Sequence, residues 1–390
     1  MSLVRVMLHS AKDTSQNEIL SDMTNTVSSE AFSKLFCQDT PLLDVRAPCE
    51  FSRGAFPNAI NLPLLSDSER EAVGTTYKKE GKSAAIALGH RLVNSEAKER
   101  LLVNWMRFID ASPNAIVLCH RGGLRSQTVQ AWLAEAGYTI ARAEGGYKSL
   151  RRNLIDATEQ LASSGQLMIV AGKTGSGKTH FINSLPCSID LEGLANHRGS
   201  AFGRRVNLQP SQTTFENALG VSIIKATALT SSVVAVEDES HAIGSLSIPH
   251  KFHCAMKEAP IALIEETLES RIKTIRLDYV QSNYKDFKQQ SAERADSAFT
   301  NFLLDSLDRI KKRLGIELYR LIKSLMEEAL KQQFAAGTLE QHELWISELL
   351  RSYYDPMYEY QLRKKAANIV FRGDKQQVRN WLASQARKAE

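Results

Sequence analysis

Cys119 is the residue whose surroundings point most clearly to chemistry. It ends the apolar run Ala115–Cys119 and begins a short loop that leads into a helical pattern. The N-terminus of a helix carries partial positive charge and free N–H groups, so a thiolate beside it is stabilised and is a good nucleophile at neutral pH. The residues that would surround the sulfur are His120, Arg121, Gly122, Gly123 and Arg125.

Each of these loop residues has a chemical use. The two glycines let the backbone curl so that several amides face the sulfur. Arg121 and Arg125 would hold an anionic group of a substrate or brace the loop. The plain alternative is a small core cysteine at the end of a strand, and the loop composition argues against it.

A second pattern predicts a diphosphate site. The segment "GKTGSGKT" fits G-x-x-x-x-G-K-[S/T] in full and follows the apolar run Leu167–Gly172. Its glycines allow backbone amides to wrap a diphosphate, Lys178 neutralises the oxygens, and the Thr179 hydroxyl suits Mg²⁺. The residues of this motif are Gly172, Lys173, Thr174, Gly175, Ser176, Gly177, Lys178 and Thr179.

Two further segments are candidates for the same site. "VVAVEDES" places Glu237, Asp238 and Glu239 after an apolar strand, and Glu237 and Asp238 with Thr179 are candidate Mg²⁺ ligands. An ordinary acidic turn is the alternative. The segment Asp190–Arg205 is predicted to bind an anion near the motif, or else to be a surface loop; its candidate residues are His197, Arg198 and Arg204.

The elements that position these residues alternate between strand and helix. In the first half, strands are expected at 41–45, 59–63, 115–119 and within 138–146, and helices at 67–79, 82–110, after the cysteine loop up to Gly137, and up to about Ala162. Residues 163–166 form a plausible linker. Further strands are expected at 167–172, 188–192, 232–237 and 261–266, followed by mostly helical sequence over 268–350 and a last helix. This alternation predicts parallel sheets covered by helices.

Composition limits the class of protein. The 390 residues leave room for two domains, and 43% hydrophobic with 24% charged residues is typical of a soluble globular protein. The net charge of +5 permits a polyanionic partner. The five cysteines include no C-x-x-C pair, so neither a structural metal nor a disulfide framework is predicted. Without a signal peptide or membrane span, a reducing cytoplasmic location is expected.

The first half resembles a rhodanese domain. The similarity rests on "DVRAPCEFSRGAFPNAINLP" (Asp44–Pro63), the cysteine loop and "EGGYKSLRR" (Glu144–Arg152). Members of that family carry sulfur as a cysteine persulfide, so the resemblance implies that Cys119 is the chalcogen-bearing nucleophile. It also implies structural roles for Asp44 and Arg46, and we interpret Cys49 as structural.

The whole chain resembles the tRNA 2-selenouridine synthase family. A rhodanese domain precedes the diphosphate motif, and "LEGLANHRGSAFG", "EDESHAIG" and "YYDPMYEYQL" follow it. The resemblance implies an α/β fold with four parts: an N-terminal extension (1–27), a rhodanese-like domain (28–162), a P-loop NTPase-like α/β domain (163–285) and a helical, basic C-terminal region (286–390).

The same resemblance implies an activity. Such proteins replace the sulfur of 2-thiouridine at wobble position 34 of tRNAs for Lys, Glu and Gln with selenium from selenophosphate. They also attach a geranyl group from geranyl diphosphate, and the S-geranyl base is an intermediate. An enzyme that supplies selenophosphate is an implied partner, and a membrane is not. Cys119 would either carry selenium or attack the base, and the P-loop would hold geranyl diphosphate rather than a nucleotide.

Basic and aromatic residues of the C-terminal region are candidates for tRNA contact, with a solvated helix face as the alternative. Aromatic rings stack on splayed RNA bases. The candidates are Arg309, Lys311, Lys312, Arg313, Arg320, Lys323, Arg363, Lys364, Lys365, Tyr353, Tyr354, Tyr358 and Tyr360. Two other function classes stay open: a general sulfurtransferase fused to an ATP-using kinase or ATPase without an RNA substrate, and a non-catalytic rhodanese scaffold.

Overall fold

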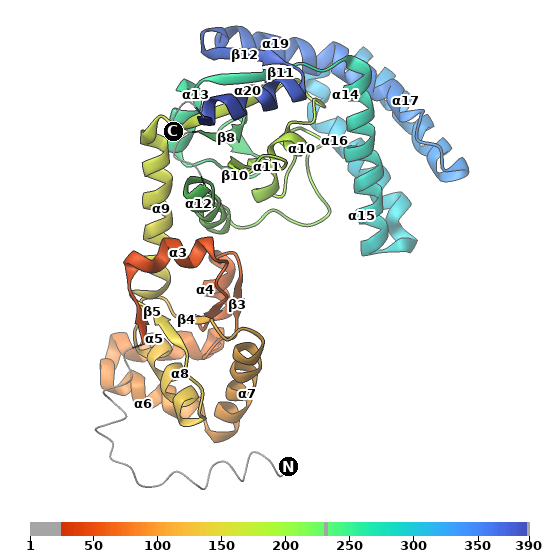
Figure 1. Ribbon diagram of the computed structural model, residues 1–390. Coiled ribbons are helices and arrows are strands. Elements are labelled where there is room, and N and C mark those ends of the chain that lie inside the picture. Colours follow the sequence, from red (N-terminus) through yellow and green to blue (C-terminus); the bar gives the residue numbers. More distant parts are fainter. Residues whose placement is uncertain (1–24, 230–232, 388–390) are drawn as a thin grey trace. The chain divides into compact units, whose positions relative to one another are not determined.

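The computed structural model describes residues 25–229 and 233–387 and divides the chain into two compact units (Figure 1). The first is Met1–Ala157 and the second is Thr158–Glu390. Each unit has its own sheet and its own hydrophobic core. The two units are therefore described separately.

The first unit is built on a five-stranded parallel sheet in the order β1-β5-β4-β2-β3. The strands are short because each is a brief apolar run between turns: β1 Thr26–Val27, β2 Leu42–Asp44, β3 Ala59–Asn61, β4 Ile116–Leu118 and β5 Ala141–Ala143. The central strands β2 and β4 are fully buried, as expected of a sheet covered on both faces. Since Cys119 directly follows β4, it lies at the carboxyl edge of this sheet.

Helices surround this sheet. They are α3 Phe32–Cys37, α4 Pro48–Arg53, α5 Asp67–Glu80, α6 Lys82–Leu92, α7 Ser95–Ala111, α8 Leu124–Glu135 and α9 Gly146–Ser164. The single helix predicted over 82–110 is two helices. The helical conformation is interrupted at Val93–Asn94. The Asn94 side chain caps α7 by accepting a hydrogen bond of 2.9 Å from the Ala97 N–H. The core beneath is centred on Trp105, Val117 and Leu133.

The second unit has a five-stranded parallel sheet in the order β12-β11-β6-β8-β7. Its strands are β6 Leu167–Gly172, β7 Ser188–Ile189, β8 Val234–Glu237, β11 Ile261–Ile264 and β12 Ile369–Gly373, and a small hairpin joins β9 Ala242–Ile243 to β10 Leu246–Ser247. The edge strand β12 comes from the end of the chain and lies beside β11 (Figure 1). The C-terminal segment thus completes the sheet that carries the P-loop.

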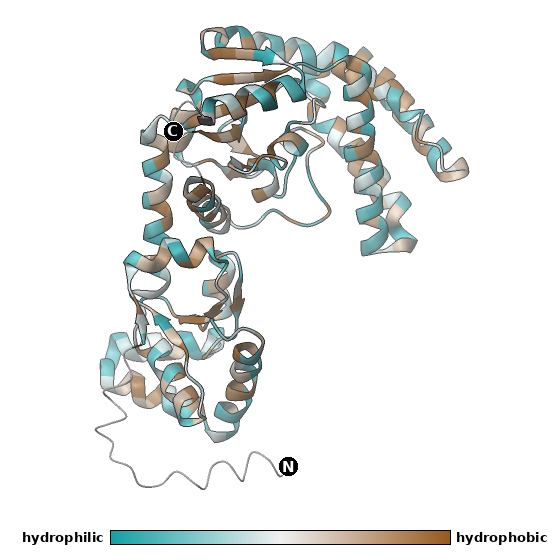
Figure 2. Cartoon of the chain, in the orientation of Figure 1, coloured by the Kyte–Doolittle hydropathy of each residue, from teal (hydrophilic) through white to brown (hydrophobic). Residues whose placement is uncertain are grey.

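Helices of two groups complete this unit. The sheet is accompanied by α10 Lys178–Ile182, α11 Leu191–Leu194, α12 Gln212–Leu229, α13 His250–Glu258 and α20 Lys375–Arg387. A helical subregion comprises α14 Leu268–Ile275, α15 Asn283–Gln290, α16 Ala295–Leu314, α17 Ile316–Ala336, α18 His342–Leu349 and α19 Asp355–Lys364. These helices carry both apolar and polar residues (Figure 2). The buried apolar residues form a separate core around Phe299, Met326 and Trp345.

The parallel sheets with flanking helices confirm the predicted α/β class. Several boundaries differ from the sequence prediction, and the strands predicted at 41–45, 59–63, 115–119 and 261–266 are each shorter in the structure. Thr26–Val27, placed in the extension 1–27, form β1; the rest of that extension up to residue 24 lies outside the described residues. Helix α9 runs through Ser164, which leaves only two residues of the linker predicted at 163–166. The strand predicted at 188–192 ends at Ile189, because Asp190 caps α11.

A buried ion pair gives the first unit a testable weak point. Arg46 and Asp44 are 2% and 0% exposed, and Nη2 of Arg46 lies 2.6 Å from Oδ2 of Asp44. Arg46→Met would leave a buried carboxylate unpaired, so we expect the free energy of unfolding to fall by about 3–5 kcal/mol. Chemical denaturation of the full chain measures this loss. Arg70→Met is the control, since Arg70 is half-exposed and its 3.7 Å ion pair should contribute less than about 1 kcal/mol. Equal losses in both variants would contradict this expectation.

Candidate functional site

Cys119 lies in the loop between β4 and α8, directly after the last residue of the strand. The side chain is 3% exposed. Its Sγ lies 3.2 Å from Oγ of Ser126 and 3.8 Å from the carbonyl of Gly123, the residue that precedes α8. The sulfur is therefore held beside the helix N-terminus, where a thiolate is stabilised.

The cysteine loop is clamped by the segment that begins α9. The Tyr147 N–H donates to the Cys119 carbonyl at 2.8 Å, and the Lys148 N–H donates to the His120 carbonyl at 3.1 Å. Gly146 has a φ of 58°, and a Cβ there would collide with the Cys119 carbonyl and the Gly122 amide. Close approach of these two backbones thus requires glycine, which explains the "EGG" of the sequence.

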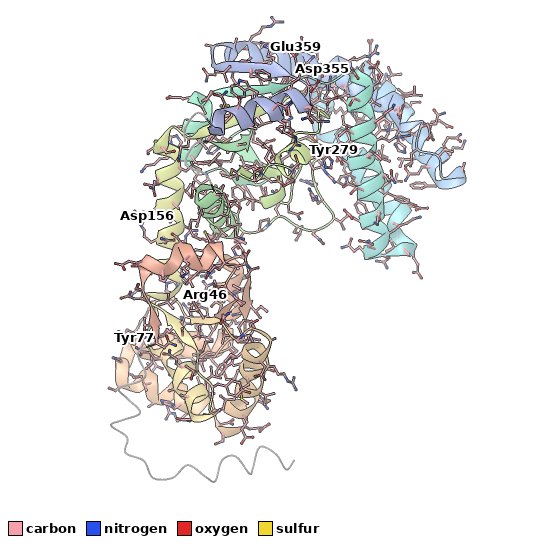
Figure 3. The ribbon with its side chains drawn as sticks, viewed as in Figure 1. Arg46, Tyr77, Asp156, Tyr279, Asp355 and Glu359 are labelled. Atoms are coloured by element: carbon pink, nitrogen blue, oxygen red, sulfur yellow. The ribbon has the colours of Figure 1, made fainter. Side chains whose placement is uncertain are left out.

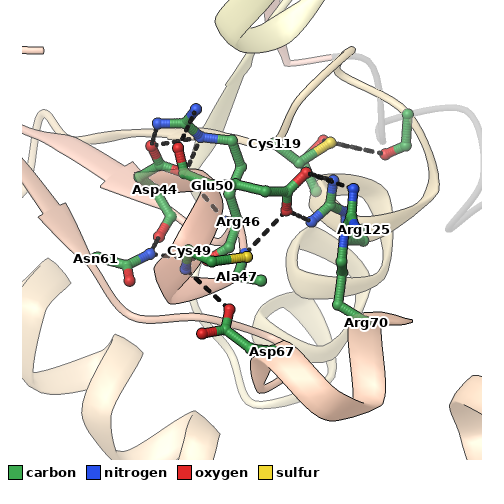
Figure 4. Close-up of polar contacts among 12 residues, drawn as sticks. Asp44, Arg46, Ala47, Cys49, Glu50, Asn61, Asp67, Arg70, Cys119 and Arg125 are labelled. Atoms are coloured by element: carbon green, nitrogen blue, oxygen red, sulfur yellow. Dashed lines mark hydrogen bonds and ion pairs between the residues drawn. The ribbon is translucent and has the colours of Figure 1, made fainter. Parts of the chain in front are cut away.

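The two loop arginines have different surroundings. Arg125 forms a two-point contact with Glu50, at 2.5 and 3.2 Å (Figure 4). Burial by itself raises the pKa of Glu50, but the Arg125 guanidinium holds that pKa below its usual range. Arg125 consequently braces the loop, whereas Arg121 is exposed. His120 is exposed and stacks on Tyr147, with ring centroids 6.3 Å apart.

The P-loop follows β6 and leads into α10, as the motif predicts. Gly175 and Gly177 have φ values of 83° and 74°, which glycine adopts without strain. The Lys178 Nζ donates to the Gly172 carbonyl at 2.6 Å, so the lysine lies folded back over its own loop. The Ser176 hydroxyl is buried without a hydrogen-bond partner in the described chain.

Residues from distant helices anchor the P-loop. Arg271 of α14 donates to the Thr174 carbonyl at 2.9 Å and forms a two-point ion pair with Asp355 of α19. Lys173 pairs with Glu359 at 2.7 Å, so its charge is compensated (Figure 3 labels Asp355 and Glu359). The motif therefore offers Lys178 to a ligand and uses Lys173 for structure. Sequence reasoning missed these anchors, although Asp355 and Glu359 stand in the segment "YYDPMYEYQL" that carried part of the resemblance.

Acidic side chains gather next to Thr179. Its hydroxyl donates to Glu192 at 2.9 Å, and the Glu192 N–H donates to Glu237 at 3.2 Å. Burial and the nearby Glu192 raise the pKa of Glu237 to about 8. Burial together with Glu192 and Glu237 also raises the pKa of Glu239 well above its usual value. Asp238 instead pairs with Lys365 at 2.5 Å, so the structure groups Glu192 with Glu237 where the sequence had suggested Asp238.

This arrangement fits a cation. The Glu237 Oε1 is buried without a hydrogen-bond partner in the described chain. Burial and the neighbouring carboxylates raise the pKa of Glu237 by more than Lys178 lowers it. No cluster of three or more His, Cys, Asp and Glu side chains with metal-binding geometry occurs among residues 25–229 and 233–387. A P-loop Mg²⁺ does not need one, because it keeps waters and substrate phosphates as ligands.

A cleft of about 960 Å³ in the second unit brings these groups together. The P-loop and Glu192 form one part of its lining, and Arg198, Arg205 and Arg309 form another. Arg198 is the one predicted anion-binding residue that lines the cleft. His197 is 6% exposed behind it, where burial and nearby arginines lower its pKa to about 4, and Arg204 is exposed.

The candidate tRNA-contacting residues separate into two groups. Several line the cleft: Arg309, Arg313, Tyr353, Tyr354, Tyr358, Lys364 and Lys365. The others are outside its lining. Lys311 lies 4.6 Å above the ring of Tyr319, Lys323 is 3.8 Å from Glu327, and Tyr360 is 60% exposed. Lys312, Arg320 and Arg363 are exposed.

Comparison with known proteins identifies the family. The family model of the rhodanese-like domain matches residues 28–153, and that of the tRNA 2-selenouridine synthase AAA domain matches residues 165–389. A tRNA 2-selenouridine synthase of Marinobacter nauticus is 45% identical over 93% of this chain and 99% of its own. One of Photobacterium profundum is 47% identical over 91% of this chain and 97% of its own. This chain belongs to the tRNA 2-selenouridine synthase family.

Membership of the tRNA 2-selenouridine synthase family confirms the predicted resemblance and the pairing of a rhodanese-like with a P-loop-like domain. It does not by itself assign the residues, so the roles of the two loops rest on their geometry. In the described part of the chain, every helix is too short or too polar to span a bilayer.

The raised pKa of Glu237 predicts how stability depends on pH. Between about pH 4.5 and 8 the folded state binds a proton that the unfolded state has lost, so the free energy of unfolding should fall as pH rises. One such group contributes at most about 1.4 kcal/mol per pH unit. We expect Glu237→Gln to flatten this part of the profile, measured by denaturant titration at several pH values.

The exposed Glu258 provides the control, and Glu258→Gln should keep the wild-type slope. Added Mg²⁺ should reduce the wild-type slope, because a bound cation favours the ionised carboxylate. The cation site described above would be ruled out if Mg²⁺ left the pH dependence of the wild-type free energy of unfolding unchanged and Glu237→Gln had the same pH dependence as wild type.

Proposed function

We propose that this protein converts 2-thiouridine at wobble position 34 of tRNA to 2-selenouridine. The selenium donor is selenophosphate, and the route passes through an S-geranyl base made from geranyl diphosphate. Its substrates are tRNAs of the Lys, Glu and Gln type, and an enzyme that makes selenophosphate supplies the donor. Membership of the tRNA 2-selenouridine synthase family supports the tRNA part of this proposal.

The observation that carries the geranyl part is a small apolar pocket against the P-loop. Thr174 of the P-loop forms one wall, and the other walls include Phe202, Ile275, Trp345 and Leu349. A diphosphate on the P-loop would therefore have hydrocarbon surface beside it. Geranyl diphosphate combines these two chemistries in one molecule, with a charged end for the P-loop and an apolar end for the hydrocarbon surface beside it. The pocket has a volume of about 20 Å³, so its lining side chains would have to move apart to admit the whole geranyl chain.

Chemistry favours this order of steps. A thiocarbonyl sulfur is a poor leaving group, and alkylation converts it into a thioether sulfur that can depart as a thiolate. In the first step the sulfur forms a bond to the allylic carbon of geranyl diphosphate, the C–O bond breaks and pyrophosphate leaves. Lys178 and the P-loop amides would stabilise the charge that develops on pyrophosphate. Mg²⁺ held by Thr179 and Glu237 would add positive charge at the same oxygens.

The selenium step uses the first unit. Selenium of selenophosphate forms a bond to C2 of the base, the C–S bond breaks and geranylthiol leaves, and water then cleaves the P–Se bond and releases phosphate. Cys119, held beside the N-terminus of α8, either attacks C2 and is then displaced from it by selenium, or carries the selenium as a selenosulfide, a form that requires a two-electron oxidant in addition to selenophosphate. Both roles need a thiolate, and both leave the alkylation step to the P-loop.

Cys119→Ala should separate the two reactions. We expect loss of 2-selenouridine and retention of S-geranyl-2-thiouridine, because the diphosphate site lies in the other unit. Mass analysis of nucleosides from thiolated tRNA incubated with both donors measures each product. Cys49→Ala is the matched control, since Cys49 lies in the same unit but belongs to α4 and not to the cysteine loop, and its backbone N–H donates to Asp67 (Figure 4). A Cys119→Ala enzyme that forms 2-selenouridine at the wild-type rate would disprove this role.

Lys178→Ala tests the identity of the P-loop ligand. We expect geranylation to fall by at least about 100-fold, in line with the removal of one charge-stabilising donor. Lys257→Ala, which removes another lysine of the same cleft, should stay near wild type. Wild-type enzyme should geranylate thiolated tRNA in Mg²⁺ buffer without any nucleotide. Strict dependence on ATP would contradict the proposal and favour a fused ATPase.

A further inference from the structure

The cleft contains a cluster of arginines that the diphosphate chemistry does not use. Arg198 and Arg205 come from the loop between α11 and α12, and Arg309 comes from α16. In the described chain, none of the three has a carboxylate within ion-pair distance. Arg198 donates to Asn283 at 2.5 Å, and Arg309 donates to the Ala201 carbonyl at 2.7 Å and to Ser306 at 2.6 Å. The Nε of Arg205 is buried without any partner.

Positive charges kept together in this way repel one another. Burial and Arg205 lower the pKa of Arg198, and burial and Arg204 lower the pKa of Arg309. Each guanidinium would be stabilised by an anion placed among them. Asp278 and Asp305 act on Arg198 and Arg309 through space but form no ion pair with them. A cationic group whose charge is compensated only in part is typical of a binding site for an anion.

The loop that carries the cluster has a fixed shape. Phe202 is 3% exposed and stacks on Trp345 of α18, with ring centroids 5.8 Å apart. The Tyr279 hydroxyl donates to the Arg198 carbonyl at 3.2 Å. Gly203 lies so close to the Arg198 carbonyl that a Cβ would clash with it. The guanidiniums are therefore positioned before any ligand arrives, which lowers the cost of binding.

We propose that Arg198, Arg205 and Arg309 form a second phosphate site, which binds a phosphodiester of the RNA substrate next to the target nucleotide. This inference rests on the proposed tRNA substrate. The P-loop and Lys178 already serve one diphosphate, so a separate cationic group in the same cleft requires a second anion. Guanidinium forks match the two free oxygens of a phosphodiester. Tyr353 lines the same cleft and provides a face on which an unstacked base can lie.

Arg205→Gln is the sharpest test, because it removes the guanidinium whose Nε has no partner and leaves the loop contacts in place. We expect the Kd for thiolated tRNA to rise about tenfold, and the slope of log K against log salt to become shallower by roughly 0.7–1. Lys331→Gln is the control with the same loss of charge. Lys331 is exposed on α17 outside the cleft lining, and this change should alter the Kd by less than about twofold.

Arg309→Lys adds a second variant that retains the charge. It should keep the wild-type salt slope and still weaken tRNA binding, because an ammonium cannot reproduce the fork. Thermal unfolding of each variant checks that the loop is intact. In parallel, geranyl diphosphate binding is measured by calorimetry and should change by less than about twofold in Arg205→Gln.

The outcomes are distinguishable. If Arg205→Gln leaves the tRNA affinity and the salt slope unchanged, the inference is overturned. The proposed function still stands in that case, provided that the wild-type enzyme modifies thiolated tRNA. A parallel loss of geranyl diphosphate affinity would assign the arginines to the diphosphate and also overturn it. Inorganic phosphate could compete with a ligand of the wild-type enzyme and fail to do so in Arg205→Gln, while the tRNA affinity is the same in both. That result would assign the site to a small phosphate and overturn the RNA assignment. Failure of the wild-type enzyme to modify thiolated tRNA would instead count against the proposed function.

Discussion

The geometry of the cleft depends on one buried ion pair, between Arg271 and Asp355. Arg271 is 3% exposed, and its guanidinium contacts both carboxylate oxygens of Asp355 and the carbonyl of Thr174. A buried charge is tolerated only when such partners satisfy it. Because Thr174 belongs to the P-loop and Asp355 begins α19, this single group fixes the P-loop against the helix that carries Tyr358 of the cleft. The first unit uses the same device, since Asp44–Arg46 and Glu50–Arg125 fix the backbone around Cys119. In both units, ion pairs immobilise the loop and leave the reactive group, Cys119 or Lys178, outside them.

The sequence predicted the parts of the site whose partners are close in the chain. The cysteine loop and the P-loop each lie between a strand and a helix within about ten residues, so their spacing alone encodes their geometry. The break at Asn94 was missed because the helical pattern of apolar residues continues through it, and the capping asparagine is the only local signal. The segment "NIVFRG" of the edge strand β12 stands out locally before the last helix, but its place in the sheet does not, since it pairs with a strand more than 100 residues earlier.

Long-range charge pairing explains the remaining differences. Asp238 follows an apolar strand, as a metal-binding carboxylate of a P-loop protein does. It nevertheless forms an ion pair with Lys365 from the C-terminal region. Glu192 takes its place beside Thr179, from a segment that was predicted to bind anions. Local spacing identifies acidic residues near the right strand, but tertiary contacts decide which of them face the ligand. The same holds for the arginines, where Arg205 lines the cleft and the neighbouring Arg204 does not.

One segment, Asp190–Arg205, supplies opposite charges to the two parts of the cleft. Glu192 stands at the Thr179 end, and Arg198 and Arg205 stand at the other end. Gly199 lies between them with a φ of 43°, and a Cβ there would come within 2.5 Å of the Glu192 carboxylate. The backbone thus passes directly over the carboxylates, and Glu192 acts on Arg198 through space without forming an ion pair with it. A carboxylate group that lacks a cation and a guanidinium group that lacks an anion are both relieved only by ligands. The charge pattern of this segment therefore favours simultaneous occupation by a cation with its diphosphate and by a second, separate phosphate.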